Sequence, residues 1–382
     1  MGTMIESRRR LGARMLAILV IAALVAAVIG CGPEAGAFAD PNLEAVVRRA
    51  IDKPEGPIYP EDLESLTTLY AWKSGIVSLG GLEYCINLTK LDLPSNQISD
   101  ISPLAGLPSL TDLDLGSNQI SDISPLESLI NLTELRLSFN QIRDISPLAG
   151  LTNLTSLYLL DNEIGDISPL AGLTNLTYLN LEFNQIRDIS PLEGLTNLRH
   201  LRLWHNEISD ISALEGVTNL TELWLSSNQI SDIAPLVGLT GLKELYLDSN
   251  AISDVSPLAG LTSLTSLSLS DNQISDIEAV SGLTELWVLY LEGNQISDIT
   301  PVSGLVHLGG GTGGFLRIED GQVIHLDLSG NEIADISALV LNEGLAEGAG
   351  IDLSWNPLSE QSINEYIPAL QARGVTVYYD EP

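Results

Sequence analysis

Basic residues, cysteines and aromatic residues are all scarce in this chain of 382 residues. Only 17 Lys and Arg stand against 50 Asp and Glu, which gives a formal net charge of −33. Nucleic acids and anionic lipid surfaces are bound by clustered basic side chains, so neither is expected as a partner. The presence of only two cysteines also excludes a disulfide scaffold.

The apolar part of the chain is mainly aliphatic. Hydrophobic residues make up 45% of the sequence but aromatic residues only 5%. This hydrophobic content is too high for a disordered acidic polymer. Together with 33 glycines, it favours many similar thin layers over one irregular core.

Residues 1–30 have the pattern of an export signal. Four arginines between residues 8 and 14 precede an uncharged run of 16 residues, from Met15 to Gly30. A membrane-spanning helix needs about 20 apolar residues, so we expect this segment to be cleaved and not to remain as an anchor.

Two cleavage sites are compatible with this signal. In the first, Val28-Ile29-Gly30-Cys31 resembles the lipobox of bacterial lipoproteins, and an acylated Cys31 would begin a tether over residues 31–39. In the second, Ala37-Phe38-Ala39 is an A-x-A site that would release a secreted protein beginning at Asp40. We favour the first because Cys31 directly follows the apolar run. The expected location is then the cell envelope, on the outside of the cytoplasmic membrane or on the outer membrane.

A period of 22 residues organises most of the chain. Each unit has the form L-x-x-L-x-L-x-x-N-x-I-x-D-I-x-P-L-x-x-L-x-x, as in residues 154–175. The asparagines that mark the period without a break are Asn96, Asn118, Asn140, Asn162, Asn184, Asn206, Asn228, Asn250, Asn272 and Asn294. Over residues 66–358 the pattern resembles the leucine-rich repeat family, and its N-Q-I-S-D-I-S-P-L form resembles the internalin-type repeats of bacterial surface proteins.

The resemblance implies an α/β repeat fold, a solenoid with a concave parallel β-sheet and short helical or 3-10 turns on the convex side. In this family the asparagines form a ladder inside the solenoid, which Asn331 and Asn356 would continue. Ser102-Pro103 and its equivalents predict a hydroxyl N-cap before a proline in each turn. The aspartate column from Asp100 to Asp298 is accordingly interpreted as turn chemistry and not as a row of calcium ligands.

Stacked repeats leave apolar ends that need caps. Residues 40–65 predict a helical N-terminal cap, with Asp40 as the N-cap of a helix over 41–52. Residues 359–382 predict a C-terminal cap, with a helix that Pro368 kinks or shortens and a closing strand over 375–379. A glycine-rich insertion at about 309–323 predicts a bulge or a hairpin turning at Asp320-Gly321, because no Lys-Ser or Lys-Thr follows to make a phosphate loop.

The third, fifth and seventh positions of each repeat are predicted to project from the concave sheet. In the central repeats these positions hold aromatic and charged residues that a core of Leu and Ile does not need, and such residues dominate binding hot spots. The candidate ligand-binding residues are Tyr158, Tyr178, Asn180, His200, Arg202, Trp204, Glu222, Trp224, Glu244, Tyr246, Asp248 and Tyr290. An acidic patch on the N-terminal repeats, partly balanced by Lys90 and Arg136, would attract a basic ligand and consists of Asp92, Asp112, Asp114 and Glu134.

The sequence predicts a non-catalytic, monomeric protein that binds a protein or peptide on its concave face, without cofactor or metal. His200 and Glu222 share the central surface, but no activated Ser or Cys completes a catalytic triad with them. Cys85 falls in a leucine column of the core. Two alternatives stay open: a structural envelope protein whose sheet residues only reflect β-propensity, and a glycan-binding protein that uses Trp204 and Trp224.

Overall fold

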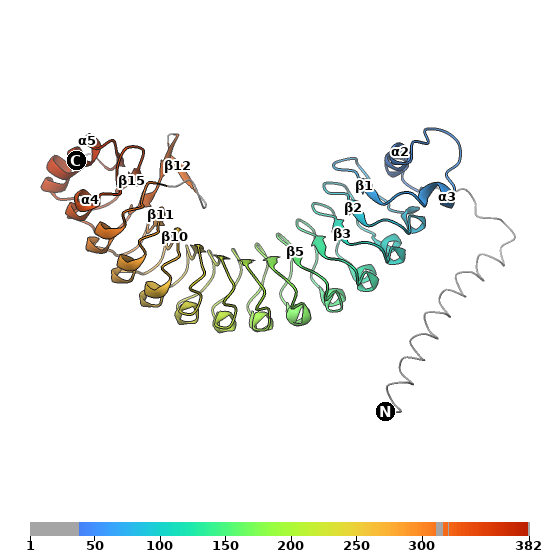
Figure 1. Cartoon of the computed structure of the whole chain (residues 1–382), viewed down its shortest axis with the longest axis horizontal. Coiled ribbons are helices and arrows are strands. Elements are labelled where there is room, and N and C mark those ends of the chain that lie inside the picture. Colours follow the sequence, from blue (N-terminus) through green and yellow to red (C-terminus); the bar gives the residue numbers. More distant parts are fainter. Residues whose placement is uncertain (1–37, 311–315, 320, 381–382) are drawn as a thin grey trace, which may run out of the picture.

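The repeats of the chain form a curved solenoid in the computed structural model, which describes residues 38–310, 316–319 and 321–380. Figure 1 shows the strands along the inner side of the arc and the helical turns along the outer side. The sheet has 14 strands in the order β1 to β11, β14, β15, β16. The predicted leucine-rich repeat solenoid is confirmed, whereas the predicted signal and Cys31 lie outside the described residues.

The strands are β1 Thr68–Tyr70, β2 Lys90–Asp92, β3 Asp112–Asp114, β4 Glu134–Arg136, β5 Ser156–Tyr158, β6 Tyr178–Asn180, β7 His200–Arg202, β8 Glu222–Trp224, β9 Glu244–Tyr246, β10 Ser266–Ser268, β11 Val288–Tyr290, β12 Arg317–Glu319, β13 Gln322–Ile324, β14 Leu326–Asp327, β15 Gly350–Asp352 and β16 Thr376–Tyr378. The helices are α2 Pro41–Ala50, α3 Pro60–Leu63, α4 Ser337–Leu341 and α5 Ile367–Ala372. Single 3-10 turns, such as Ser102–Gly106 and Ser190–Leu192, complete the repeats.

Each strand lies directly beside its equivalent in the next repeat. Leu179 pairs with Leu201, and Leu201 pairs with Leu223, in parallel register. These central leucines point into the solenoid and are fully buried, while the residues on either side point the other way, since side chains alternate along a strand. The 22-residue period therefore produces one continuous aliphatic core.

The asparagine ladder runs inside the turn that follows each strand. In the repeat of Asn184, Nδ2 donates to the carbonyl oxygens of Leu159 at 3.0 Å and Leu181 at 3.1 Å, and Oδ1 accepts from the backbone N–H of Ile164 at 3.0 Å. The same three contacts recur at both ends of the ladder, Asn96 and Asn356. Each rung thus joins neighbouring repeats through groups that would otherwise be buried without partners.

The aspartate column caps the 3-10 turns. Oδ1 of Asp100 accepts from the backbone N–H of Ser102 at 2.8 Å, and this bond lowers the pKa of Asp100. The hydroxyl N-cap predicted for Ser102 is wrong, because Ile101 occupies the cap position and makes no side-chain cap bond, while Ser102 already lies inside the turn. The carboxylate two residues earlier supplies the acceptor instead.

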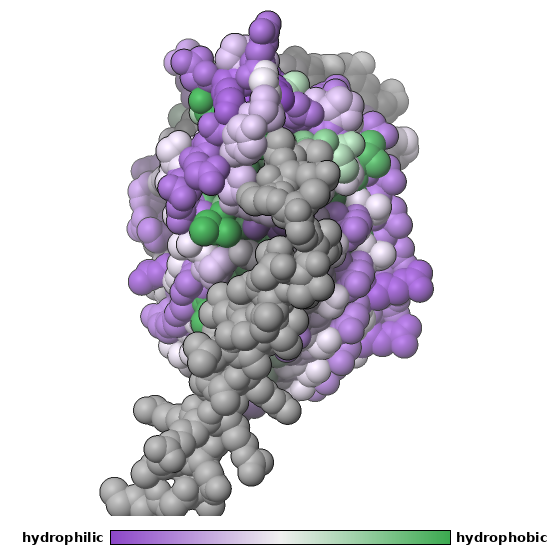
Figure 2. Space-filling view, turned by 90° about the vertical axis from the view of Figure 1, so that its right-hand side faces the viewer, coloured by the Kyte–Doolittle hydropathy of each residue, from purple (hydrophilic) through white to green (hydrophobic). Residues whose placement is uncertain are grey.

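The N-terminal end of the core is covered by α2. Asp40 is its N-cap and accepts from the backbone N–H groups of Asn42 and Leu43, while its second oxygen accepts from Val77 at 2.6 Å. Burial opposes the charge of Asp40, but these backbone N–H bonds outweigh burial and lower its pKa. Figure 2 shows the molecule from this end, with hydrophilic residues (purple) spread over much of the described surface in view.

The C-terminal end is covered by a helix that contains one wide turn. A π turn, Ser362–Tyr366, directly precedes α5 and Pro368. Proline lacks an N–H group and its ring displaces the carbonyl group four residues earlier, which explains the wider turn at this point. After α5, β16 pairs in parallel with β15. No helix in the described part of the chain is long and apolar enough to cross a membrane.

The insertion folds as a hairpin on the inner side of the arc (Figure 1). β12 pairs with β13 in antiparallel register, and Glu319 faces Gln322 across the turn. Gly321 has a φ of 80°, whereas Asp320 lies outside the described residues. The predicted hairpin is therefore present, and it leaves β11 and β14 as neighbours in the main sheet.

Candidate functional site

Rings and guanidinium groups from neighbouring strands of the concave sheet stack in one continuous row. Arg136 lies 5.0 Å from the ring of Tyr158, and the rings of Tyr158 and Tyr178 stack at 4.6 Å. Arg202 lies 5.7 Å from the ring of Tyr178 and 4.2 Å from that of Trp224. The order of the row from β4 to β9 is Arg136, Tyr158, Tyr178, Arg202, Trp224 and Tyr246. Cation–π and ring contacts hold each member in place, so the row is a rigid surface.

A carboxylate anchors the middle of this row. Glu222 accepts from Nε of Arg202 at 2.8 Å, and its other oxygen lies 3.0 Å from Nδ1 of His200. The predicted neighbourhood of His200 and Glu222 is thus present in the structure. Burial, reinforced by the charge of Glu222, raises the pKa of Glu244 on the next strand.

Trp204 is the large exposed ring beside the row, with 36% of its surface exposed. Its ring meets that of Phe183 edge to face at 4.9 Å, and Phe183 in turn lies 4.8 Å from the ring of His205. The indole N–H of Trp204 donates to Oγ of Ser227 at 3.2 Å. Phe183 and His205 were not predicted as site residues because they occupy the eighth position of their repeats.

A backbone signal could have identified these two residues. Phe183 and His205 have φ values of 52° and 56°, a left-handed conformation that is unfavourable for bulky side chains. Most other repeats place small or polar residues there, such as Ser227 and Asp271, although Phe139 and Trp355 are also large rings with a positive φ. A large ring at a position that disfavours it indicates a use other than folding.

Three predicted site residues are buried and do not project freely from the concave face. Asn180, Tyr246 and Tyr290 are 5%, 6% and 7% exposed. Asn180 bonds with Glu182, which lies just beyond the end of β6, and Tyr246 packs against the ring of Trp224 at 5.0 Å. The prediction that these three side chains are exposed is wrong. Asn180 and Tyr246 are covered by the larger side chains of Glu182 and Trp224.

Tyr290 is covered by the insertion hairpin. Its hydroxyl group donates to the carbonyl oxygen of Ile324 at 2.9 Å and accepts from the backbone N–H of Arg317 at 2.8 Å. The Arg317 side chain also pairs with Glu292 and with the buried carboxylate of Asp327. The hairpin therefore closes the C-terminal end of the concave face.

Comparison with known proteins identifies the repeats. A model described as "Leucine Rich repeats (2 copies)" matches residues 86–128, 130–172, 174–216 and 218–260, and a model described as "Leucine rich repeat" matches residues 240–296. The chain belongs to the leucine-rich repeat family. An internalin (inlF) from Listeria monocytogenes is 37% identical with a TM-score of 0.81, over 90% of this chain and 96% of that chain.

Two further structures are similar to this leucine-rich repeat protein. The internalin C2 (inlC2) of Listeria monocytogenes is 42% identical with a TM-score of 0.51, over 54% of this chain and 92% of that chain. A leucine-rich repeat protein of Leptospira interrogans is 21% identical with a TM-score of 0.59, over 84% of this chain and 97% of that chain, and shows the shared fold alone. The repeats are of the internalin type.

The predicted acidic patch of the leucine-rich repeat face is partly neutralised. Lys90 lies 2.8 Å and Arg136 3.8 Å from the carboxylate of Asp112, and Arg136 also pairs with Glu134. Burial raises the pKa of Asp114. These pairs hold the patch together, and they weaken the attraction that was expected for a basic ligand.

The first repeat carries two exposed aromatic residues that were not predicted as part of the site. Tyr70 and Trp72 are 57% and 69% exposed, and Lys90 and Lys73 lie near their rings. They occupy the fifth and seventh positions of this degenerate repeat. Aligning this repeat with the regular ones would therefore have predicted that both side chains project from the concave sheet.

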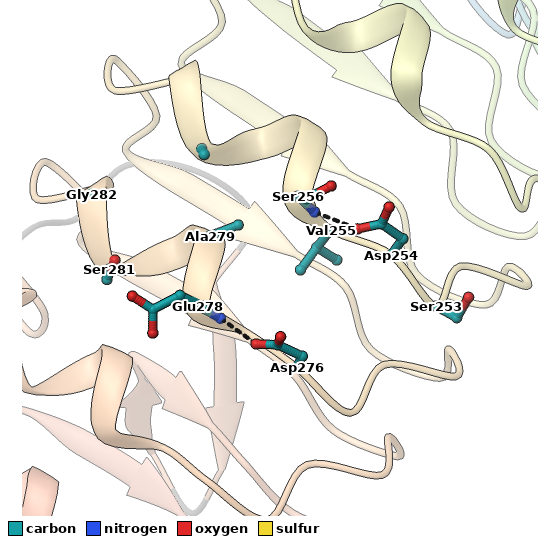
Figure 3. A pocket seen from close by; sticks show the side chains of 10 residues that line it. Ser253, Asp254, Val255, Ser256, Asp276, Glu278, Ala279, Ser281 and Gly282 are labelled. Carbon is teal, nitrogen blue, oxygen red and sulfur yellow. Dashed lines mark hydrogen bonds between the residues drawn. The ribbon is translucent and has the colours of Figure 1, made fainter.

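Hollows on the two sides of the leucine-rich repeat solenoid differ in character. One of about 520 Å³ lies between convex turns (Figure 3). Its Asp254 and Asp276 accept from backbone N–H groups, as the turn aspartates of the other repeats do, so they have a structural role. A smaller hollow of about 200 Å³ lies beside Trp204 on the concave face.

Metal and nucleophile chemistry have little support in the described residues. Among them, no group of three or more His, Cys, Asp or Glu could hold a metal ion. Cys85 is fully buried in the core, and burial raises the pKa of its thiol to about 12. A buried thiol that stays protonated is a poor nucleophile.

Proposed function

We propose that this internalin-type leucine-rich repeat protein is a non-catalytic binding protein whose concave face holds a protein or peptide. The observation that carries the proposal is the continuous row of stacked rings and guanidinium groups beside Trp204. The leucine core is complete without these side chains. Because they are already held in place, a partner would lose little side-chain entropy on binding them.

We also propose that the protein is exported and anchored through an acylated Cys31. The apolar run that ends at Gly30 supports this proposal. Mass spectrometry of the mature N-terminus should detect a lipid-modified Cys31. An unmodified chain that begins at Asp40 would contradict the anchor and support secretion.

Glycan binding through paired tryptophans has less support. Arg202 lies 4.2 Å from the Trp224 ring, and the Tyr246 ring lies 5.0 Å from it. Sugars bind on an open ring face, and these neighbours already pack against Trp224. Of these two tryptophans, only Trp204 is left for stacking.

A capture experiment tests the proposed binding face. The double variant Trp204→Ala, Trp224→Ala should lose a partner that the wild type retains from a cell-envelope extract. Once that partner is purified, we expect its affinity for the variant to fall by a factor of about 30 or more, equivalent to about 2 kcal/mol.

The matched control changes exposed aliphatic residues outside the concave sheet. Ile130 and Val237 are 57% and 56% exposed, so Ile130→Ala, Val237→Ala removes exposed apolar surface elsewhere. This control should capture the partner as the wild type does. Equal capture by all three proteins would refute the concave site and favour a structural envelope role.

A further inference from the structure

The hollow beside Trp204 is a slot one repeat wide. Trp204 and Asp248 occupy the seventh positions of repeats on either side of Ser226, whose small side chain leaves the space between them open. Oγ of Ser226 donates to Oδ2 of Asp248 at 2.7 Å, which places the carboxylate at one end. Trp224 and Tyr246 line the slot with their rings. We call this space, with a volume of about 200 Å³, the Trp204 slot.

The carboxylate of Asp248 is held by neutral donors. It accepts from the hydroxyl groups of Ser226 and Ser268 and from the backbone N–H of Ser270 at 3.3 Å. Within the described part of the chain it forms no ion pair. A carboxylate offers about four lone-pair positions, so Asp248 can also accept from a cationic donor.

The surroundings of the Trp204 slot are acidic. On β6 to β9 and the residues that directly follow them, the outward positions hold one arginine, Arg202, and four carboxylates. Arg202 is already paired with Glu222 at 2.6 Å. The carboxylates are Glu182, Glu222, Glu244 and Asp248. An anionic ligand would be repelled here, whereas a cation would be attracted.

One of these four carboxylates, Glu182, is buried on the Trp204 side of the slot. Glu182 is 5% exposed, and its Oε1 has no hydrogen-bond partner among the described residues. Such an unpaired oxygen is costly in a folded protein. Trp204 follows Glu182 by one repeat and Asp248 follows it by three, so Glu182 contributes to the charge of this face and does not line the slot.

The same face already binds a guanidinium group of its own. Arg202 lies 4.2 Å from the Trp224 ring and donates to Glu222 at 2.8 Å. An aromatic ring face and a carboxylate together are the usual environment of a bound arginine. The planar guanidinium group stacks on the ring, and its N–H groups donate to the carboxylate. The Trp204 slot offers a second set of the same parts, without an arginine to fill it.

We propose that the Trp204 slot binds one basic side chain of the partner protein, preferably arginine, with its stem on the Trp204 ring and its charged end on Asp248. This inference rests on the proposed function, since it specifies what part of a partner the concave face recognises. Binding should weaken as salt is added, because a charge pair near the surface is screened.

Capped tripeptides test the slot in the full chain. Gly-Arg-Gly should quench tryptophan fluorescence with a dissociation constant on the order of 1 mM. Its citrulline counterpart has the same shape without the charge, and should bind at least about tenfold more weakly. Asp248→Asn should reduce arginine binding by a similar factor, and Ser226→Leu, which fills the slot and keeps the charge, should abolish it.

A matched acid elsewhere provides the control. Glu215 lies exposed on a convex turn, so Glu215→Gln removes one negative charge away from the slot and should leave binding unchanged. Thermal unfolding of each variant must match the wild type. If Asp248→Asn unfolds at a lower temperature than the wild type, the peptide binding of Ser226→Leu alone tests the slot.

The outcomes separate the slot from the proposed function. Equal binding of the arginine and citrulline peptides, or no binding of either, would overturn the slot inference. If the slot inference fails in this way but the Trp204→Ala, Trp224→Ala variant still loses the partner, the proposed concave binding face stands without the slot. If the arginine peptide binds as expected but that variant keeps the partner, the slot exists and the proposed function fails.

Discussion

Asn184→Ala should lower the free energy of unfolding by about 3 kcal/mol, because it removes one rung from the ladder inside the solenoid. The amide loses its bonds to the carbonyl oxygens of Leu159 and Leu181, and the N–H group of Ile164 loses its acceptor. Asn184 is only 8% exposed, so water cannot replace these bonds without opening the turn. Urea unfolding followed by far-ultraviolet circular dichroism measures the loss.

Asn175→Ala is the matched control for this prediction. Asn175 is exposed and its amide donates to one carbonyl oxygen, that of Thr152, at 2.9 Å. Water can satisfy that group in its place, so we expect a cost below about 1 kcal/mol. Equal losses for the two variants would show that the ladder contributes no more than a surface bond.

Gly350→Ala should destabilise the C-terminal end of the solenoid by about 3 kcal/mol, since overpacking against backbone forces the structure to move. A Cβ atom on Gly350 would overlap the carbonyl oxygen of Val323 and lie 3.1 Å from its carbonyl carbon. Val323 belongs to the hairpin that covers Tyr290. Urea unfolding measures the loss of stability. Faster proteolytic cleavage of the hairpin in the variant would show that the hairpin is the part that is loosened.

Gly194→Ala is the corresponding control. A Cβ atom on Gly194 would have nothing within 4 Å, so its stability should stay within about 0.5 kcal/mol of the wild type. If Gly350→Ala is as stable as the wild type and its hairpin is cleaved at the same rate, the close approach of Gly350 to the Val323 carbonyl group is contradicted.

The repeat fold could be predicted from the sequence because its main contacts join equivalent positions. A leucine such as Leu201 packs against Leu179 and Leu223 in the adjacent repeats, and Asn184 bonds to groups of its own and the preceding repeat. A strict period makes these neighbours identical along the chain. The sequence of one repeat was therefore enough to predict which residues form the core and which form the asparagine ladder.

The candidate site was predictable only in part. The outward positions of Arg202 and Trp224 follow from the period, and the structure places these residues in contact. Tyr178 joins the same row from the third position of its repeat, which the period does not predict. Phe183 was missed because only the third, fifth and seventh positions were expected to project from the sheet, whereas the eighth position, which has a positive φ along the repeats, lies just beyond them.

The sequence alone determined that this chain is acidic and built from a 22-residue repeat, and the resemblance of that repeat to internalin-type units predicted the solenoid. The tertiary structure decided which concave side chains stay accessible. Tyr290 is buried because an irregular insertion folds back over it, whereas the Trp204 slot is open because Ser226 is smaller than the neighbours on both sides. The first depends on an insertion that interrupts the period, and the second depends on the size of one side chain between two larger ones, so neither follows from the repeating pattern.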